Sequence, residues 1–187
     1  VGANGGGKAL AERWNGASWT TLTMPLPGGS LASTMKKISC ASASACVITG
    51  TSSGGGTSAF TMTGAGTSWT LAGKAPTNYN DISCTSLTAC TAVGAESGKT
   101  HIQSWSGSEW ATQTSPNPSG KSASLAGVSC VSALACMAVG KAYSATESET
   151  LAVRYGSEWT LETPPNPVAE SQSQLYDVSC VSSTACL

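Results

Sequence analysis

The chain has 187 residues, which is enough for one domain with a sizeable core. Only 10% of the residues are charged and the formal net charge is −1. The sequence therefore lacks the excess of basic residues that binds nucleic acid and has no polybasic segment that could bind a membrane surface. No apolar run approaches the roughly 20 residues of a membrane-spanning helix. We therefore expect neither a nucleic-acid partner nor membrane insertion. The 21 glycines and the frequent Ser and Thr favour short strands joined by turns.

The first segment carries Trp14 and Trp19 on either side of an Asn15-Gly16 turn. Aromatic residues that flank a turn hold a hairpin together through cross-strand contact, and large rings also dominate packing between sheets. Stacking against a sugar is the alternative role, which we favour less because aromatic pairs recur along the chain. The later pairs are Trp105/Trp110 and Tyr155/Trp159.

All eight cysteines follow one pattern, in which five residues separate the members of a pair. The pairs are Cys40/Cys46, Cys84/Cys90, Cys130/Cys136 and Cys180/Cys186. Eight cysteines permit about 105 pairings, but a spacing that recurs four times predicts a disulfide within each motif. The spacing is neither that of a zinc site nor Cys-x-x-Cys, and the chain has a single histidine, His101. We expect structural disulfides in an oxidising compartment, with no metal and no cofactor.

The cysteine pairs belong to a longer repeat, [Ile/Val]-Ser-Cys-x-Ser-x-x-Ala-Cys, whose first cysteines lie 44, 46 and 50 residues apart. The repeat around Cys130 shows four strand-like runs. Leu151, Val153 and Tyr155 in its third run alternate with other residues, as in a strand. Four short antiparallel strands in about 40–50 residues are typical of one blade of a β-propeller.

We therefore predict an all-β fold, a β-propeller of four-stranded antiparallel blades with about four repeats and one disulfide per blade. Residues 1–187 would form a single propeller domain or a section of one. The approximate blades are 35–74, 79–114, 125–163, and a split blade of 175–187 plus 1–24. Leu187 and Val1-Gly2 would share one strand of that split blade, either in a four-bladed ring or in a section of a longer repeat protein. We favour the longer protein, because a break inside a strand leaves its ladder weakly held.

The repeat resembles the cysteine-bearing β-propeller repeats of secreted bacterial proteins, which carry Ser-Cys-x-Ser-x-x-x-Cys-x-Ala-Val-Gly. The segments from Cys84 to Gly94 and from Cys130 to Gly140 match this signature closely, whereas Cys46-Val-Ile-Thr-Gly50 departs from it at Ala-Val. The resemblance implies a propeller fold and a secreted, extracellular location. It leaves the activity open, because propellers host many unrelated functions.

Residues that differ between repeats stand just before each innermost strand, where they would rim a central channel. We expect the best ligand-binding candidates among them to be Lys37, Tyr79, Asp81, Tyr176 and Asp177. The alternative is that these side chains cap or hydrogen-bond the following turn. Because the four positions differ, a single asymmetric site is expected rather than four identical ones.

No catalytic residues are assigned, because no nucleophile elbow, zinc-protease motif, phosphate loop or sialidase box is present. Variable connections would gather at one end of the blades, which we call the long-loop end. Its segments are 25–36, 51–58, 75–80, 95–100, 115–126, 141–150 and 164–176. We expect a non-enzymatic binding or scaffold module that recognises a glycan or an extracellular protein there. The alternatives are a self-associating structural repeat array and an accessory domain of a larger secreted hydrolase.

Overall fold

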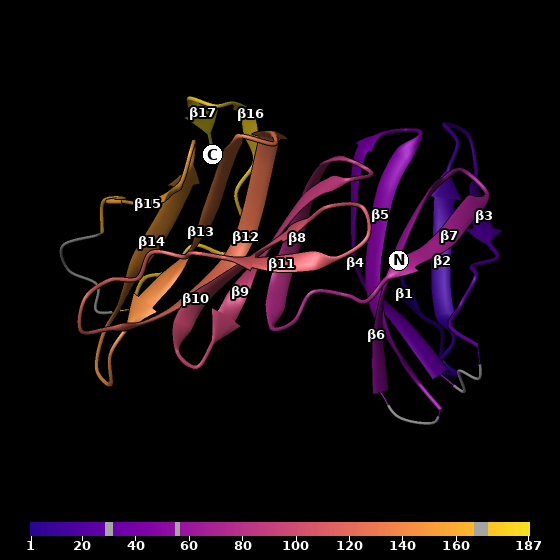
Figure 1. Cartoon of the computed structure of the whole chain (residues 1–187), viewed down its shortest axis with the longest axis horizontal. Coiled ribbons are helices and arrows are strands. Elements are labelled where there is room, and N and C mark those ends of the chain that lie inside the picture. The colour runs from indigo at the N-terminus through magenta and orange to yellow at the C-terminus, as the bar shows by residue number, and fades with distance from the viewer. Residues whose placement is uncertain (29–31, 55–56, 167–171) are drawn as a thin grey trace. The chain divides into compact units, whose positions relative to one another are not determined.

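The computed structural model describes residues 1–28, 32–54, 57–166 and 172–187, and all regular structure in these residues is strand (Figure 1). The predicted all-β class is therefore confirmed. No helix in the described part of the chain could cross a membrane. The strands are β1 (Gly2–Ala3), β2 (Ala9–Trp14), β3 (Trp19–Leu22), β4 (Ala32–Ser42), β5 (Ala45–Ser53), β6 (Thr57–Ala65), β7 (Ser68–Gly73), β8 (Tyr79–Ser86), β9 (Ala89–Glu96), β10 (Lys99–Trp105), β11 (Trp110–Gln113), β12 (Ser122–Ser132), β13 (Ala135–Tyr143), β14 (Ser148–Tyr155), β15 (Trp159–Glu162), β16 (Cys180–Ser182) and β17 (Ala185–Cys186).

The chain divides into two compact units. The first unit is Val1–Pro76 with Ser86–Thr88 and Ser106–Trp110, and the second is Thr77–Thr85, Ala89–Trp105 and Ala111–Leu187.

Three of the sheets are four-stranded meanders, in the orders β4-β5-β6-β7, β8-β9-β10-β11 and β12-β13-β14-β15. They cover residues 32–73, 79–113 and 122–162. The remaining described strands form a sheet of β1, β2 and β3 and a separate pair of β16 and β17. The joining of these last two sheets into one split blade, and the arrangement of all sheets around an axis, stay predictions.

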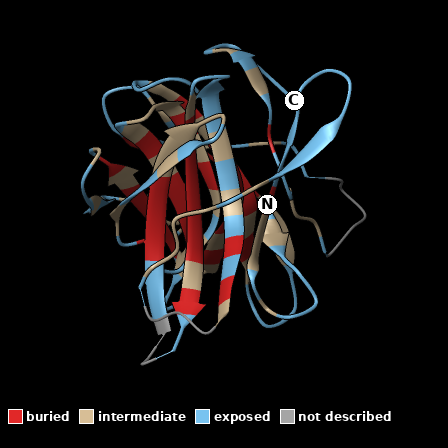
Figure 2. Ribbon diagram, turned by 90° about the vertical axis from the view of Figure 1, so that its right-hand side faces the viewer, coloured by how far each residue is buried: buried red, intermediate tan, exposed pale blue. Residues whose placement is uncertain are grey.

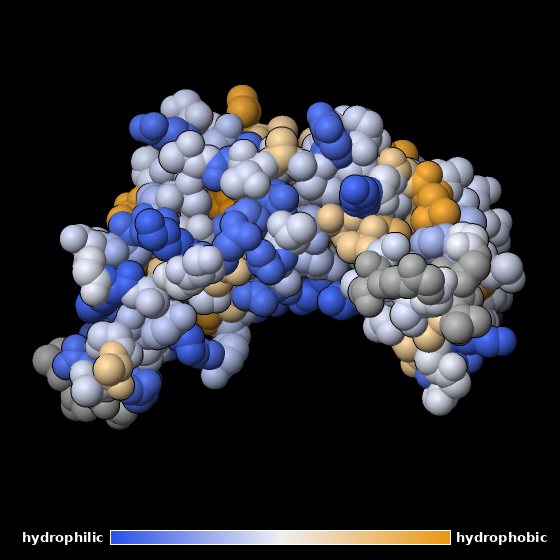
Figure 3. Space-filling view, turned by 60° about the horizontal axis from the view of Figure 1, so that its bottom comes forward, coloured by the Kyte–Doolittle hydropathy of each residue, from blue (hydrophilic) through white to orange (hydrophobic). Residues whose placement is uncertain are grey.

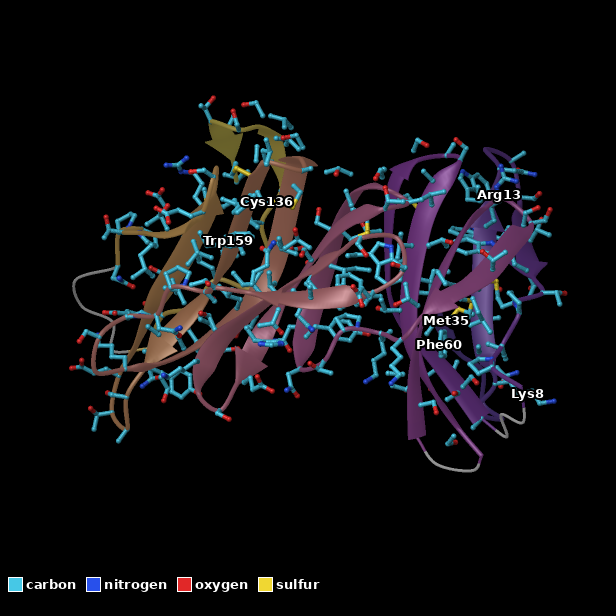
Figure 4. All side chains as sticks on the ribbon, in the orientation of Figure 1. Lys8, Arg13, Met35, Phe60, Cys136 and Trp159 are labelled. Carbon is cyan, nitrogen blue, oxygen red and sulfur yellow. A yellow bond between two sulfur atoms is a disulfide. The ribbon has the colours of Figure 1, made fainter. Side chains whose placement is uncertain are left out.

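The middle strands of the four-stranded sheets carry runs of buried residues, and the last strand of each sheet is more exposed (Figure 2). In the first unit, Met35, Ile48, Phe60 and Met62 pack with Ala11 (Figure 4). In the second unit the main cluster spans the sheets β8–β11 and β12–β15. Its buried residues are Val93, Ile102, Ala123, Leu125, Val128, Cys136, Ala138, Leu151, Val153 and Trp159.

The strands β4 and β12, the first of their sheets, each carry a bulge at the same repeat position. The register with the next strand shifts between Met35 and Lys37, and between Leu125 and Gly127. The residue opposite the start of the second bulge is Gly140, where an added Cβ would lie 2.0 Å from the Ser124 carbonyl oxygen. The glycine that ends each apolar segment of the repeat thus allows close approach of the bulged strand.

The four disulfides join the two cysteines of each motif, as the spacing predicts. Each Cα–Cα distance is 4.0 Å, because the partners face each other across the first two strands of a sheet or, for Cys180–Cys186, across the β16–β17 pair. The motif serine two positions after the first cysteine stabilises the intervening turn, since its hydroxyl accepts the N–H two residues further on. These serines are Ser42, Ser86, Ser132 and Ser182, with N–Oγ distances of 3.2, 3.1, 3.3 and 3.3 Å.

Candidate functional site

The serine that precedes the first cysteine links neighbouring repeats in the second unit. The backbone N–H of Cys130 donates to Ser83 Oγ at 2.9 Å, and that of Cys180 donates to Ser129 Oγ at 3.0 Å. A side chain of one innermost strand thereby satisfies a backbone donor of the next. Sequence reasoning missed this role, although the recurrence of Ser before every first cysteine was the signal.

Asp81, a predicted ligand-binding residue, is engaged with the neighbouring strand β12. Its Oδ2 accepts the N–H of Val128 at 3.1 Å, and the adjacent Asn80 donates from Nδ2 to the Leu125 carbonyl at 2.7 Å. Val128 is buried, so this carboxylate satisfies a donor that water cannot easily reach. The geometry matches the alternative role, a side chain that hydrogen-bonds nearby backbone.

Asp177 accepts the N–H of Val178, the residue that corresponds to Val128 in the next repeat. Gly127 aligns with Asp81 in the repeat that contains β12, and it has no side chain that could accept the N–H of Val178. That N–H donates to Asp177 Oδ1 at 2.8 Å. An added Cβ at Gly127 would lie 2.7 Å from the Asp177 Cα. Both aspartates therefore flank the segment Gly127-Val128, and both accept a backbone N–H, Asp81 from Val128 of β12 and Asp177 from the adjacent Val178.

The other three candidates differ in exposure and location. Tyr176 is 74% exposed in the second unit, beside Gly127 through its backbone. Tyr79 begins β8 and is half-buried. Lys37 is half-buried on β4 in the first unit, directly after the bulge. Within the second unit, Asp81 and the Tyr176-Asp177 pair thus come to one segment of β12, with Tyr176 the most exposed side chain among the candidates there.

The long-loop end of the second unit varies from sheet to sheet. The β9–β10 connection is a tight turn, since Glu96 pairs with Lys99 across Ser97-Gly98. The β13–β14 connection is longer and is held by its own contacts, which include hydrogen bonds from Thr146 and Glu147 N–H to Ser144 Oγ. Figure 3 brings this end of the strands forward and shows mostly hydrophilic side chains.

Charged and aromatic side chains stand near the longer β13–β14 connection. Lys121 Nζ lies 2.7 Å from Glu149 Oε2, and Lys141 Nζ lies 5.3 Å from the centre of the Tyr143 ring. The predicted long-loop segments 25–36, 51–58 and 164–176 lie partly outside the described residues.

The single histidine, His101, is a buried strand residue. It lies within β10, with Nδ1 3.6 Å from Glu96 Oε2, while Nε2 has no partner among the described residues. Within the described ranges, no group of three or more His, Cys, Asp or Glu side chains could hold a metal ion.

The aromatic pairs are not equivalent between the two units. In the second unit Trp105 is 3% exposed and Trp159 is 7% exposed, and Trp159 Nε1 donates to Gln113 Oε1 at 2.8 Å. In the first unit Trp14 is 49% exposed and Trp19 is 67% exposed, with ring centres 5.6 Å apart and planes inclined at 42°. The structural role expected of these residues therefore fits the second unit better than the first.

Comparisons with protein-family models, with curated protein sequences and with solved structures gave no match.

Proposed function

We propose that this chain is a secreted, non-enzymatic module, a β-propeller or a section of one, that binds a glycan or an extracellular protein at its long-loop end. The propeller architecture is supported by four-stranded meanders of one repeat type, with one disulfide in each. It is further supported by the serine links, which join the first strands of successive repeats in the second unit, β8 to β12 and β12 to β16.

One observation supports the binding function most directly. The residues that recur in every repeat make contacts within the fold, whereas the connections that differ between repeats lie at the long-loop end of the strands. The motif cysteines form disulfides, the motif serines bond turns and neighbouring strands, and the motif glycine admits a bulge. In contrast, the β9–β10 and β13–β14 connections differ in length and in side chains. A constant scaffold with variable connections is the usual arrangement of a recognition protein.

The non-enzymatic assignment is supported by the aspartates. Hydrolysis by paired carboxylates needs groups that can exchange protons with a substrate. The only two aspartates of the chain, Asp81 and Asp177, both accept backbone N–H groups instead.

The secreted location is supported by the cysteines, all eight of which form disulfides. Such bonds form and persist in oxidising compartments, and proteins of the reducing cytosol seldom keep them.

The test is a binding screen against a glycan array and a panel of extracellular proteins, followed by variants at the two ends of the strands. In one variant, Ser144–Glu147 is replaced by the Ser-Gly turn of β9–β10; in a second, Tyr176→Ala removes the exposed ring. The matched control is Leu134→Ala, an apolar residue in the turn at the opposite end that is 66% exposed, against 74% for Tyr176. We expect at least a tenfold loss of affinity in one of the long-loop variants and none in the control. A screen without any hit, or hydrolysis that Asp81→Ala abolishes, contradicts the proposal.

A further inference from the structure

A cleft lies between the two four-stranded sheets of the second unit, β8–β11 and β12–β15, at the end opposite the long loops. It consists of two hollows that share Gln113 and Tyr155 as lining residues, and we call the two together the Gln113 cleft. The inner hollow measures about 130 Å³, and the outer one, which opens to solvent, measures about 430 Å³. Pockets that hold small ligands usually measure about 300–1,000 Å³, so the outer hollow has the size of a ligand site.

The walls of the Gln113 cleft come from the turns of both sheets. The β8–β9 and β12–β13 hairpins bring Cys90 and the Cys130–Cys136 disulfide to the inner hollow. The β14–β15 turn brings Ser157 and Glu158 to the outer one. Each of the two sheets has all four of its strands and its own disulfide hairpin. The cleft is therefore a feature of two whole neighbouring repeats.

Hydroxyl groups dominate the polar lining of the inner hollow. Ser83 Oγ accepts the N–H of Cys130 at 2.9 Å, and Ser132 Oγ accepts the N–H of Leu134 at 3.3 Å. Ser104 lines the same hollow from β10, and its hydroxyl has no partner among the described residues. The volume of about 130 Å³ gives room for several water-sized groups, since one water molecule takes roughly 30 Å³ in the liquid. Such a lining suits the hydroxyl groups of a ligand better than an apolar group.

Gln113 lines both hollows, and its amide is held in one orientation. Trp159 is only 7% exposed and donates from Nε1 to Gln113 Oε1 at 2.8 Å. Because an indole can only donate, the amide oxygen faces Trp159, and Nε2 keeps two N–H donors that no described residue accepts. The same repeat position carries Ala72 and Glu162 in other sheets, so this pair of donors distinguishes the Gln113 cleft.

The outer hollow adds an acceptor and an aromatic wall. Glu158 is exposed, and it is the one charged side chain among the described residues that line the cleft. Its carboxylate can accept hydrogen bonds from ligand hydroxyls and repels anionic ligands. The Tyr155 ring is half-buried and packs against Trp159, with ring centres 5.1 Å apart. Tyr155 is thus a fixed apolar surface beside the polar groups.

From these groups we infer that the Gln113 cleft binds the terminal unit of a neutral saccharide. Sugar hydroxyls both donate and accept, which matches the carboxylate of Glu158 and the free N–H groups of Gln113. The C–H surface of a sugar ring matches Tyr155, and a single hydroxyl or hydroxymethyl arm is small enough for the inner hollow. The proposed function places recognition at the long-loop end, whereas this cleft lies at the opposite end of the strands. It therefore goes beyond the proposed function and depends on different residues.

The test is calorimetric titration of the whole chain with glucose, galactose, mannose, xylose and N-acetylglucosamine, and with their short oligomers. We expect at least one neutral sugar to bind, and glucuronic acid to bind more weakly because Glu158 repels its carboxylate. Gln113→Glu keeps the acceptor for the Trp159 indole but removes both free donors, so the affinity should fall about tenfold or more. Ser104→Ala should weaken the same binding roughly three- to tenfold, as for one neutral hydrogen bond.

Two glutamate variants test the charge of the cleft. Glu158→Gln should bring the affinity for glucuronic acid closer to that for the neutral sugar, because the repulsion is removed. The matched control is Glu109→Gln, which changes an exposed glutamate at the same turn position of β10–β11, outside the cleft. This variant should bind every sugar like the wild type. Circular dichroism and the unfolding midpoint establish that each variant is folded.

Three outcomes overturn the inference. The first is the absence of binding to every neutral sugar at millimolar concentration, and the second is binding that Gln113→Glu and Ser104→Ala both retain. The third is stronger binding of a lysine-rich peptide than of any sugar, which would make the cleft a contact for a basic protein. The long-loop variants leave all lining residues of the cleft unchanged. Sugar binding that those variants lose and Gln113→Glu retains would therefore support the proposed function and contradict this inference.

Discussion

At the residue scale, a polar side chain can bind a ligand or can hydrogen-bond the backbone of its own fold. The sequence around Asp81 does not distinguish these two roles. The sequence suggests a position before a strand that a ligand could reach, but Asp81 lies within β8. Its carboxylate accepts the N–H of Val128, a residue in a different repeat. Asp177 accepts the N–H of Val178, the next residue in its own repeat. Such acceptors cost little when satisfied, but their loss leaves a buried donor without a partner.

We therefore expect Asp81→Ala to lower the free energy of unfolding by about 1–3 kcal/mol, the usual cost of an unsatisfied buried group. Asp81→Asn keeps an acceptor oxygen at the same place and should cost clearly less. Chemical denaturation followed by circular dichroism measures both. Equal unfolding midpoints for wild type and Asp81→Ala would show that the Val128 N–H does not depend on this carboxylate.

At the element scale, much of the fold follows from recurrence in the sequence. The Cys-x5-Cys spacing predicts the disulfides, and the four strand-like runs around Cys130 predict the meander β12–β15, because both features depend on contacts close in sequence. The link from Ser83 to Cys130 joins residues 47 apart and depends on how one sheet lies on the next, so no local pattern reveals it. The unequal exposure of the aromatic pairs escaped prediction for a related reason. The three aromatic pairs look alike in sequence, and only packing distinguishes exposed Trp14 from buried Trp105.

The close approach of β12 and β13 gives a prediction at the element scale. Gly140→Ala would place a Cβ 2.0 Å from the Ser124 carbonyl oxygen and 2.8 Å from the Leu125 Cα, and these backbone atoms cannot move without disturbing the bulge. We expect a loss of stability of at least about 1–3 kcal/mol, as in overpacked cores. Gly156→Ala is the matched control, since nothing lies within 4 Å of its added Cβ. A thermal or chemical unfolding curve that shifts equally for both variants would contradict this account of the repeat glycine.

At the scale of the whole molecule, the chain is rich in small residues and turns, and we expect the disulfides to contribute a large share of its stability. Gly, Ser and Thr dominate, and only 6% of the residues are aromatic. Weak cores of this kind are often reinforced by covalent links. The serine links between repeats further imply that loss of one sheet exposes backbone donors of the next.

Reduction should therefore unfold the chain as a whole. Each bridge spans a sequence separation of only 6 residues. Its loop-closure contribution is then about 2.4 kcal/mol in the chain-entropy treatment, and the four together approach 10 kcal/mol. This is the order of the total stability of a typical domain, about 5–15 kcal/mol. We expect the reduced chain to lose its strand signal in circular dichroism and its cooperative melting transition, and to regain both on reoxidation. The measurement is a melt with and without a phosphine reductant, with thiol counting to establish that all eight cysteines have been reduced. A fully reduced chain that melts at the temperature of the oxidised one would show that packing and hydrogen bonds alone maintain the sheets, and would remove the physical reason for an oxidising compartment.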